Sequence, residues 1–551
     1  MFRSRAGHGI PFVAAAPGSG RKWGQSPIAK VEMMTSTIDH NSGWVVDIAL
    51  NPPSLQDNTA DADRLKKALS HKIGVDYITV DPFVLKDLPI RLHNWDYRCR
   101  CVFFKSCGCV YLIEIMPVEN PKPAAAIAVD LGTTRVVMEM IDLVTGQSLL
   151  QSAFDNPQRE LGPDILERIH YADKPGGLDH LHHLIIDAIN EEVGRICKQA
   201  GMDRNRIFLM AVAGNTSMTH LFAGISPRGI IREPYIPAAN TFGAARAGDL
   251  GIHMNRSGRV FLFPNVGSYF GGDLIAGACY AGFQESKDIS ILVDVGTNAE
   301  VLLGNSEWLV ACAGAAGPAL EGGVSEIGMT AGPGVIDTVF IDPATRNFQI
   351  STIEDQPPKG ICGSGMIDLA AALFLSGMMD IRGRLVQDAC GERFRKVDGI
   401  PHLVVVEADA SATGRALTIS QVDIDSLIRS KAAMYTILET LLQYVGIGFE
   451  DIKTFYVAGT FGSFIKPRSA ISIGMIPDLP EETYRSLGNS SLKGAVRLLM
   501  ERGTMDQVES IGDRITYLEL NVNQDFMNRF SAAKFFPHTD AARFPSVSVR
   551  Q

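Results

Sequence analysis

Two segments of the chain end an apolar run in the same acidic turn. Residues 127–134 read Ile-Ala-Val-Asp-Leu-Gly-Thr-Thr, and residues 291–298 read Ile-Leu-Val-Asp-Val-Gly-Thr-Asn. A carboxylate at the end of a buried strand, here Asp130 and Asp294, can organise a magnesium ion through its water shell. A glycine two positions after each aspartate lets the backbone bring its N–H groups close to phosphate oxygens.

A single Asp-x-Gly-Thr turn is typical of an ordinary β-hairpin, but two copies with matching flanks are far more specific. We therefore predict two loops that face each other and hold the phosphate tail of ATP, with Mg²⁺ at Asp130. The loop residues that supply backbone N–H groups or hydroxyl donors are Gly132, Thr133, Thr134, Gly296, Thr297 and Asn298.

A third glycine turn follows a later strand. Thr454–Ala458 is a strand pattern that leads into Gly459-Thr460-Phe461-Gly462. A glycine turn lets a flat ring lie against the backbone, so Gly459 and Gly462 are the predicted adenosine contacts.

Strand and helix patterns surround these turns. Each acidic turn is followed by an apolar strand (136–141 and 299–303), a tight turn and a third apolar stretch. The run 207–213 is a buried strand that opens at 214–216 into a short helix. The small-residue segment 271–283 suits either a crossover helix between two lobes or simply a tightly packed helix. Further helices are expected at 60–70, 425–445 and 492–500.

These patterns predict an α/β protein with two facing lobes preceded by a small α/β domain, and the three turns in this order resemble the two-lobed, actin-like ATPase fold. Residues 1–43 are expected to be a disordered tail, or an over-extended start to the reading frame, rather than a targeting peptide, because a proline interrupts their apolar patch and Gly-Ser-Gly follows it. The small domain is placed at 44–116, a proline-rich linker at 117–125, the first lobe at 126–289, and the second lobe with a C-terminal return at 290–545.

Composition narrows the class of protein. The 551 residues carry a formal net charge of −10, without a concentrated basic stripe, which disfavours nucleic-acid binding. No apolar run approaches the roughly 20 residues needed to cross a bilayer. Nine cysteines, an odd number in a long chain, favour reduced thiols and a cytoplasmic location.

Four of these cysteines, Cys99, Cys101, Cys107 and Cys109, fall within eleven residues. In a hairpin with its turn near Phe104 they would share one face and could bind zinc or an iron–sulfur centre. The Cys-x-Cys spacing differs from the usual Cys-x-x-Cys knuckle, so buried or incidental cysteines are the favoured interpretation.

Several longer strings resemble the reductive activators of corrinoid proteins, within the ATPase superfamily of actin, sugar kinases and heat-shock chaperones. They are Gly-Asn-Thr-Ser-Met-Thr-His-Leu (214–221), Asp-Val-Gly-Thr-Asn-Ala-Glu (294–300), Ala-Gly-Pro-Ala-Leu-Glu-Gly (316–322), Gly-Ile-Cys-Gly-Ser-Gly (360–365), Ala-Gly-Thr-Phe-Gly (458–462) and Phe-Phe-Pro-His-Thr-Asp (535–540). The string 51–58 resembles the start of that family's middle domain. The likeness covers residues 44 to about 545.

The resemblance implies ATP-dependent reduction of a cobalt(II) corrinoid to cobalt(I), with a corrinoid protein of a methyltransferase system as partner. It also implies that Asn215 lies at the floor of the nucleotide cleft. Many family members carry an iron–sulfur domain, whereas this sequence has no cysteine before Cys99 or after Cys390. We therefore expect a separate ferredoxin-like electron donor, and a homodimer is one option for the assembly.

Two other functions remain open from the sequence. A small-molecule kinase on the same fold would need a catalytic carboxylate, for which Asp273 and Glu300 are candidates. An ATP-gated module that binds a corrinoid protein without reducing it would fit the missing cluster ligands.

Overall fold

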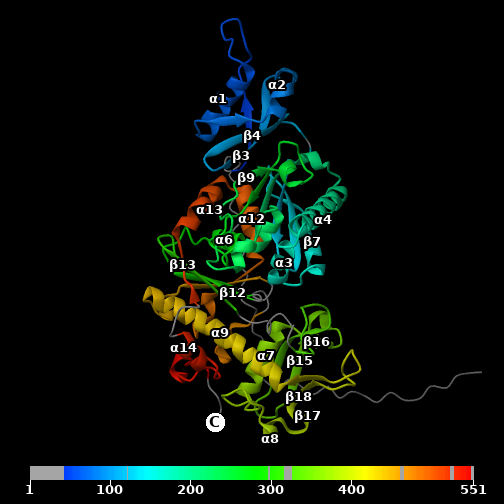
Figure 1. Cartoon of the computed structure of the whole chain (residues 1–551), viewed down its shortest axis with the longest axis vertical. Helices are drawn as coiled ribbons and strands as arrows, with labels where there is room; N and C mark the ends of the chain where they lie inside the picture. The colour runs from blue at the N-terminus through cyan, green and yellow to red at the C-terminus, as the bar shows by residue number, and fades with distance from the viewer. Residues whose placement is uncertain are drawn as a thin grey trace, which may run out of the picture.

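The computed structural model describes residues 43–120, 122–295, 298–315, 325–459, 465–520 and 526–547, with the backbone alone at residues 298 and 315. Three bodies follow one another along the long axis in Figure 1. A small α/β domain lies at one end, a lobe built on a six-stranded sheet lies in the middle, and a second lobe lies at the other end. The predicted two-lobed fold with a preceding small domain is confirmed.

The small domain has a four-stranded sheet in the order β1-β3-β4-β2. Its elements are β1 (Val45–Ala49), α1 (Asp61–Ile73), β2 (Ile78–Val80), α2 (Pro82–Asn94), β3 (Arg98–Ser106) and β4 (Cys109–Met116). Helix α2 was not predicted, because Pro82 and Pro89 disguise it. Pro82 is tolerated at the first helical position, and Asp81 caps the helix by accepting from the N–H of Phe83.

The cysteine hairpin differs from its prediction. Its turn is formed by Cys107 and Gly108, which both have positive φ (50° and 74°), and not by residues near Phe104. Cys99 and Cys101 are buried with their sulfur atoms 3.9 Å apart, whereas Cys107 and Cys109 are exposed. The four thiols therefore do not form one ligand set.

The first lobe has the strand order β7-β6-β5-β8-β10-β9. Alternation along β5 gives its two faces different partners. Ile127 and Val129 pack towards the long helix α4, while the small residues Ala126 and Ala128 face α6 and α12. The elements are β5 (Ala125–Leu131), β6 (Arg135–Asp142), β7 (Ser148–Asp155), α3 (Ile165–Ala172), α4 (Gly177–Ala200), β8 (Ile207–Gly214), α5 (Thr216–Phe222), β9 (Ala244–Arg246), β10 (Arg259–Leu262) and α6 (Gly272–Ala281).

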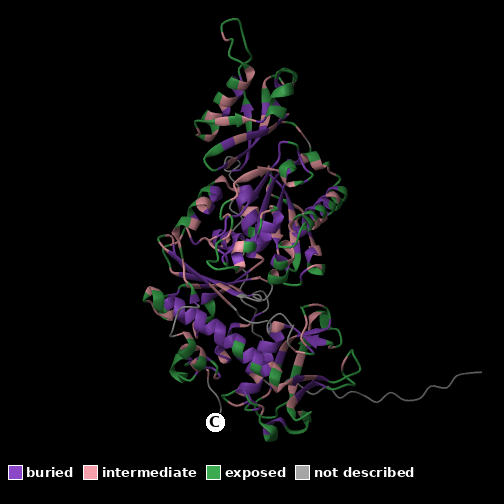
Figure 2. Ribbon diagram, viewed as in Figure 1, coloured by how far each residue is buried: buried purple, intermediate pink, exposed green. Residues whose placement is uncertain are grey.

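The second lobe has a six-stranded sheet in the order β21-β20-β11-β12-β13-β22. Its strands are β11 (Ser290–Val295), β12 (Asn298–Gly304), β13 (Leu309–Ala315), β20 (Thr454–Ala458), β21 (Tyr484–Gly488) and β22 (Ile515–Tyr517). Helix α9 (Gln421–Val445) is buried along most of its length, as Figure 2 shows, and it packs on β12 and β13.

The far part of this lobe adds two three-stranded sheets, β15-β14-β16 and β17-β18-β19, and several helices. Their bounds are β14 (Val335–Ile341), β15 (Phe348–Thr352), β16 (Gly360–Ile361), α7 (Gly363–Leu375), α8 (Gln387–Cys390), β17 (Phe394–Val397), β18 (Ile400–Val406), β19 (Leu417–Ser420), α11 (Pro467–Ser472) and α14 (Phe526–Ala533).

Two helices cross between the lobes. Helix α6 connects β10 of the first lobe to β11 of the second, as expected of a crossover helix, and it packs on α12 (Ser490–Met500), which is followed by α13 (Arg502–Arg514). A Cβ atom at Gly494 of α12 would lie 2.8 Å from the Cα atom of Ala276, so only glycine permits this approach. Within the described ranges, no helix is long and apolar enough to cross a membrane.

Candidate functional site

The acidic turns lie at the ends of the central strands in each sheet. In the first lobe, Asp130 pairs with Ala213 of β8, one residue before the pair Leu131–Gly214. In the second lobe, Asp294 pairs with Ala458 of β20, and Ala458 pairs in turn with Gly488 of β21. Because β8, β20 and β21 run parallel to their neighbours, the residues that follow them gather at the same sheet edge as the aspartates.

Three side chains hold the first loop. Asn156 donates from Nδ2 to the carbonyl of Gly132 (3.0 Å), and Asn215 donates from Nδ2 to the Thr133 hydroxyl (3.0 Å). Arg168 donates from Nη2 to the Thr133 carbonyl at 2.7 Å. These contacts fix the loop while the side chain of Thr134 remains exposed. Gly132 is required here, since a Cβ atom would collide with the carbonyl of Arg135.

Sequence reasoning missed Arg168, which is fully buried behind this loop. Its guanidinium also donates to the carbonyl of Gly162 at 2.8 Å. Burial, and then the positive charge of Arg159, lower the pKa of Arg168 to about 10. The group still carries its charge at neutral pH, so it places a positive charge directly beneath the loop. No sequence pattern marks this residue, because it lies on α3, 35 positions from the carbonyl it contacts.

Asn215 caps helix α5. Its Oδ1 accepts from the N–H of Met218 (2.9 Å), and its backbone lies against Gly271, where a Cβ atom would be 2.5 Å from the Asn215 Cα. The residue therefore joins the first loop to the start of α6. Its location at the floor of a nucleotide cleft stays a prediction.

Asp130 receives a contact from the far end of the chain. Asn489, directly after β21, donates from Nδ2 to Asp130 Oδ2 at 2.8 Å. Burial raises the pKa of Asp130, while the neighbouring Ser491 hydroxyl and the Asn489 amide oppose that rise. Neither Asn489 nor Ser491 was predicted, because the acidic turn gives no indication of which distant segment meets it.

Asp273 and Asp294 complete a group of three carboxyls. Burial raises the pKa of Asp294 to about 6, with a further contribution from the charge of Asp130. Burial, followed by the charges of Asp294 and Asp130, raises the pKa of Asp273 to about 7. None of the three residues is fully buried. Three mutually repelling carboxyls of this kind would be relieved by a cation in their midst.

Gly459 lies against this group. Its φ is +76°, and a Cβ atom would be 2.9 Å from Asp294 Oδ1. Glu300, the other carboxylate considered from sequence, lies directly across from Asp294 in the β11–β12 register. Paired residues point to the same face of a sheet, so both acids share one side.

The remaining predicted residues are placed less fully. Gly296, Thr297 and Gly462 lie outside the described residues, as does the string 316–322. Asn298 is described by its backbone, which begins β12 opposite Ala315. Across the ranges that the structure describes, no three His, Cys, Asp or Glu side chains are close enough to ligate a metal ion directly.

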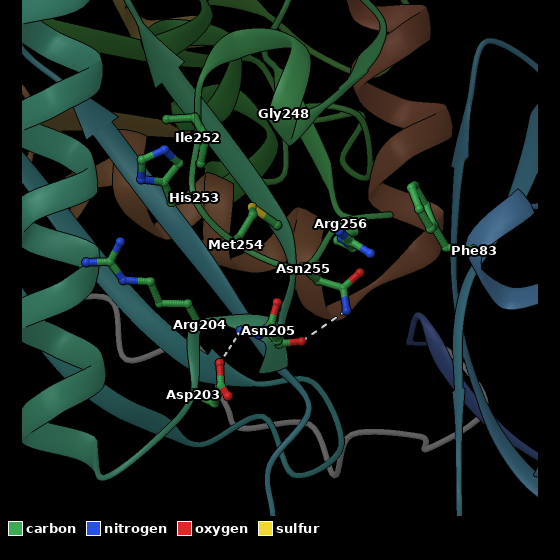
Figure 3. A pocket seen from close by; sticks show the side chains of 10 residues that line it. All are labelled: Phe83, Asp203, Arg204, Asn205, Gly248, Ile252, His253, Met254, Asn255 and Arg256. Carbon is green, nitrogen blue, oxygen red and sulfur yellow. Dashed lines mark hydrogen bonds between the residues drawn. The ribbon is translucent and has the colours of Figure 1, made fainter. Parts of the chain in front are cut away.

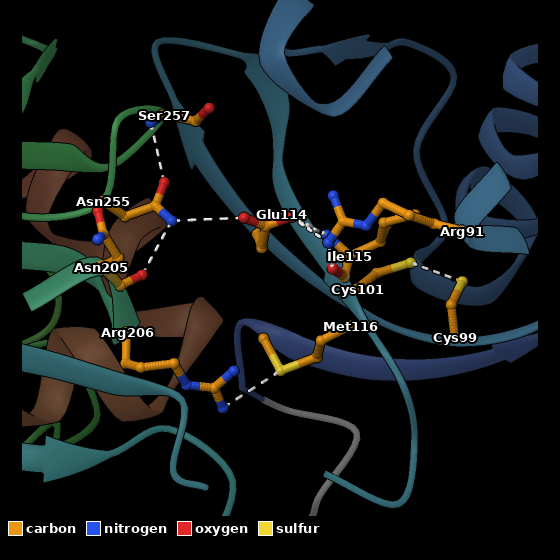
Figure 4. Close-up of polar contacts among 10 residues, drawn as sticks. All are labelled: Arg91, Cys99, Cys101, Glu114, Ile115, Met116, Asn205, Arg206, Asn255 and Ser257. Atoms are coloured by element: carbon orange, nitrogen blue, oxygen red, sulfur yellow. Dashed lines mark hydrogen bonds and ion pairs between the residues drawn. The ribbon is translucent and has the colours of Figure 1, made fainter. Parts of the chain in front are cut away.

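A separate cavity of about 520 Å³ lies between the small domain and the first lobe (Figure 3). Phe83 of α2 forms one wall, and residues 203–205 and 252–256 form much of the rest. Figure 4 shows the polar contacts beside it: Asn255 donates to Glu114 (3.4 Å), which also accepts from Arg91 (2.7 Å). This cavity shares no lining residue with the acidic group.

The two facing sheets with crossed helices define the protein's class. Residues 288–548 match the family described as the C-terminal domain of RACo, the ASKHA domain, so the chain has the actin-like ATPase fold. Residues 125–286 match the RACo middle region, and residues 41–122 match the RACo linker region. The resemblance of the string 51–58 implied the start of the middle region. The family match places this string in the linker region instead.

Known relatives agree with these matches. The corrinoid activation enzyme RamQ of Eubacterium limosum is 30% identical over 434 residues, covering 77% of this chain and 72% of that protein. The [Co(II) methylated amine-specific corrinoid protein] reductase of Methanosarcina barkeri is 25% identical over 443 residues, covering 73% and 75%. A solved reductive activator for corrinoid, iron-sulfur protein superposes with a TM-score of 0.80 at 38% identity, covering 91% of this chain and 80% of that one.

The chain therefore belongs to the family of corrinoid activation enzymes.

Proposed function

We propose that this protein is an ATPase that reductively activates a corrinoid protein of a methyltransferase system. One electron from a donor converts cobalt(II) to cobalt(I), and ATP binding and hydrolysis favour the arrangement of lobes and partner in which that transfer occurs. ATP takes no part in the redox change. The observation that carries the proposal is the family match along nearly the whole chain, combined with two acidic turns that end facing sheets.

The residues at the strand ends suit a nucleotide with magnesium. Asp130 would organise Mg²⁺ through water, and the neighbouring carboxyls of Asp273 and Asp294 add negative charge around that position. Thr133 and Thr134 on the first loop, and Gly296, Thr297 and Asn298 on the second, would donate to phosphate oxygens. Magnesium supplies a positive charge that offsets the repulsion among the carboxyls and the phosphates.

The protein's own side chains would then orient the nucleotide and its magnesium ion. Asn156, Asn215 and Arg168 hold the first loop, so its N–H groups need not reorganise when phosphate arrives. Asp294 is the candidate for positioning the attacking water, because it ends the facing strand. Gly459, and Gly462 beyond the described residues, would leave room for the adenosine.

We assign the electron to a separate ferredoxin-like donor. The two inner thiols, Cys99 and Cys101, are buried, and the two at the hairpin turn point to solvent. This division gives the small domain no common ligand set for a cluster. A cytoplasmic setting, where thiols stay reduced, suits such a donor.

The direct test mixes the protein with a cobalt(II) corrinoid protein, a reduced low-potential ferredoxin and Mg–ATP, and follows the absorbance of cobalt(I). We expect cobalt(I) only with ATP, and its loss in Asp130→Asn and Asp294→Asn variants. Retained pull-down of the corrinoid protein without any ATP-dependent cobalt(I) would identify a binding module instead. Phosphorylation of a small molecule in the same mixture would favour a kinase.

A further inference from the structure

The two lobes repeat the same strand order. The first lobe has β7-β6-β5-β8-β10, and the second has β13-β12-β11-β20-β21. Strand β21 thus occupies in the second sheet the place that β10 occupies in the first. Helix α6 is the next α-helix after β10, and α12 is the next after β21. The two crossed helices are therefore equivalent elements of the repeated unit.

Each crossed helix begins with a polar residue near the aspartate of the opposite lobe. Asn489 precedes α12 and donates to Asp130, 359 positions away. Asp273, in the first turn of α6, is close enough to Asp294 to feel its charge. The two pairs differ, because Asp130 accepts from an amide donor, whereas Asp294 has a second carboxyl nearby.

From the hydrogen bond between Asn489 and Asp130, and resting on the proposed function, we infer that Asn489 is a positioning residue that links the Asp130 carboxylate to the second lobe. Gly488 is in register with Ala458 and, through it, with Asp294. Asn489 therefore extends from the same row of the second sheet that ends in Asp294 and Gly459. The Asn489 side chain therefore couples the position of the Asp130 carboxylate to the end of strand β21 in the second lobe.

Both ends of the Asn489 amide are engaged. Its Oδ1 accepts from the N–H of Leu492 at 2.8 Å and caps α12, while Nδ2 donates to Asp130. The Ser491 hydroxyl is buried beside the same carboxylate and opposes the rise of its pKa. Helix α12 also packs on β5, β8 and α6. Asn489 therefore lies at the junction where strand β21 of the second lobe meets a helix packed on the first lobe, so a change in the angle between the lobes acts on the residue that holds Asp130.

Asn489→Asp tests this role without removing the cap. The aspartate keeps an oxygen for the N–H of Leu492, but it replaces the donor by a carboxylate facing Asp130. Asn156→Asp is the matched control. Asn156 also caps a helical turn, by accepting from the N–H of Gln158 at 3.0 Å, and it donates to the same loop at Gly132. Its contact, however, stays within the first lobe.

Three measurements on the full chain decide the inference: the unfolding midpoint, the dissociation constant for Mg–ADP, and the X-ray scattering change on saturation with a non-hydrolysable ATP analogue. We expect N489D to remain folded with a lowered midpoint, because two carboxyls then repel each other, to bind Mg–ADP about tenfold more weakly, and to lose the scattering change. N156D should also bind more weakly yet show the full scattering change at saturation.

Loss of the scattering change in both variants, or in neither, would overturn the inference. So would wild-type affinity in N489D. If the wild-type protein binds nucleotide but never produces cobalt(I), the reductive function fails while the positioning role stands. If the wild-type protein binds no nucleotide, both fail.

Discussion

A substitution at Gly459 can separate the cost of backbone strain from an effect on the Asp294 carboxylate. Its φ of +76° is the left-handed region, where an L-residue costs about 1–2 kcal/mol. In Gly459→Ala the new methyl group would lie 2.9 Å from Asp294 Oδ1, which is closer than real Cβ contacts allow. Because Asp294 ends a strand, we expect its carboxylate to be displaced from the position that faces the nucleotide.

Gly74 supplies the control for the backbone. It ends α1 with φ +72°, and a Cβ atom there would meet nothing within 4 Å. Gly459→Ala and Gly74→Ala should therefore lose a similar free energy of unfolding, about 1–2 kcal/mol in each case. Only Gly459→Ala should also bind Mg–ADP at least about tenfold more weakly, which corresponds to about 1.4 kcal/mol.

Isothermal titration calorimetry and chemical denaturation measure the two quantities on the same preparations. Equal nucleotide affinities for the two variants would refute the argument, because the extra contact at Gly459 would then have no consequence for the site. A much larger loss of stability in Gly459→Ala, with affinity unchanged, would show that the collision is relieved inside the fold rather than at Asp294.

Three further predictions follow from burial and packing. Folding raises the pKa of Asp273 to about 7 from an unfolded value of about 4, so this group's contribution to stability is full below about pH 4 and is lost as the pH rises through 7. Asp273→Asn should flatten the fall in unfolding free energy over that range, as measured by denaturant titration at a series of pH values. Gly494→Ala should destabilise the protein by about 2 kcal/mol or more because its methyl group enters α6, whereas Gly503→Ala, with open space around it, should be neutral or stabilising by thermal denaturation. In the native protein a thiol reagent should modify two of the nine cysteines, Cys107 and Cys109, and the other seven should react only on unfolding.

Each of these has a clear contrary result. An unchanged pH profile in Asp273→Asn would mean that the group titrates alike in the folded and unfolded states. Equal stability of Gly494→Ala and Gly503→Ala would remove the close crossing of α6 and α12. Rapid modification of Cys99 or Cys101 would show that the small domain opens in solution.

Much of the local structure follows from the sequence alone. The apolar run 207–213 is a strand because its residues are buried on both faces, and all eight residues of β8 are indeed buried. The apolar stripe at 425–445 predicts helix α9, and Gly446 ends that helix in the left-handed conformation. The turn of the cysteine hairpin was wrongly placed near Phe104, because the positive φ of Cys107 and Gly108, rather than the spacing of the thiols, sets it.

The sequence determined the two Asp-x-Gly-Thr turns and the strands that carry them, because hydrophobic periodicity and glycine requirements act over a few residues. Only the tertiary structure decided what surrounds the aspartates. Asn489 reaches Asp130 across 359 positions, and the buried charge of Arg168 lies beneath Thr133. Such contacts depend on how the sheets and crossed helices pack, and the energy of that packing is distributed over the whole core rather than encoded in any one motif.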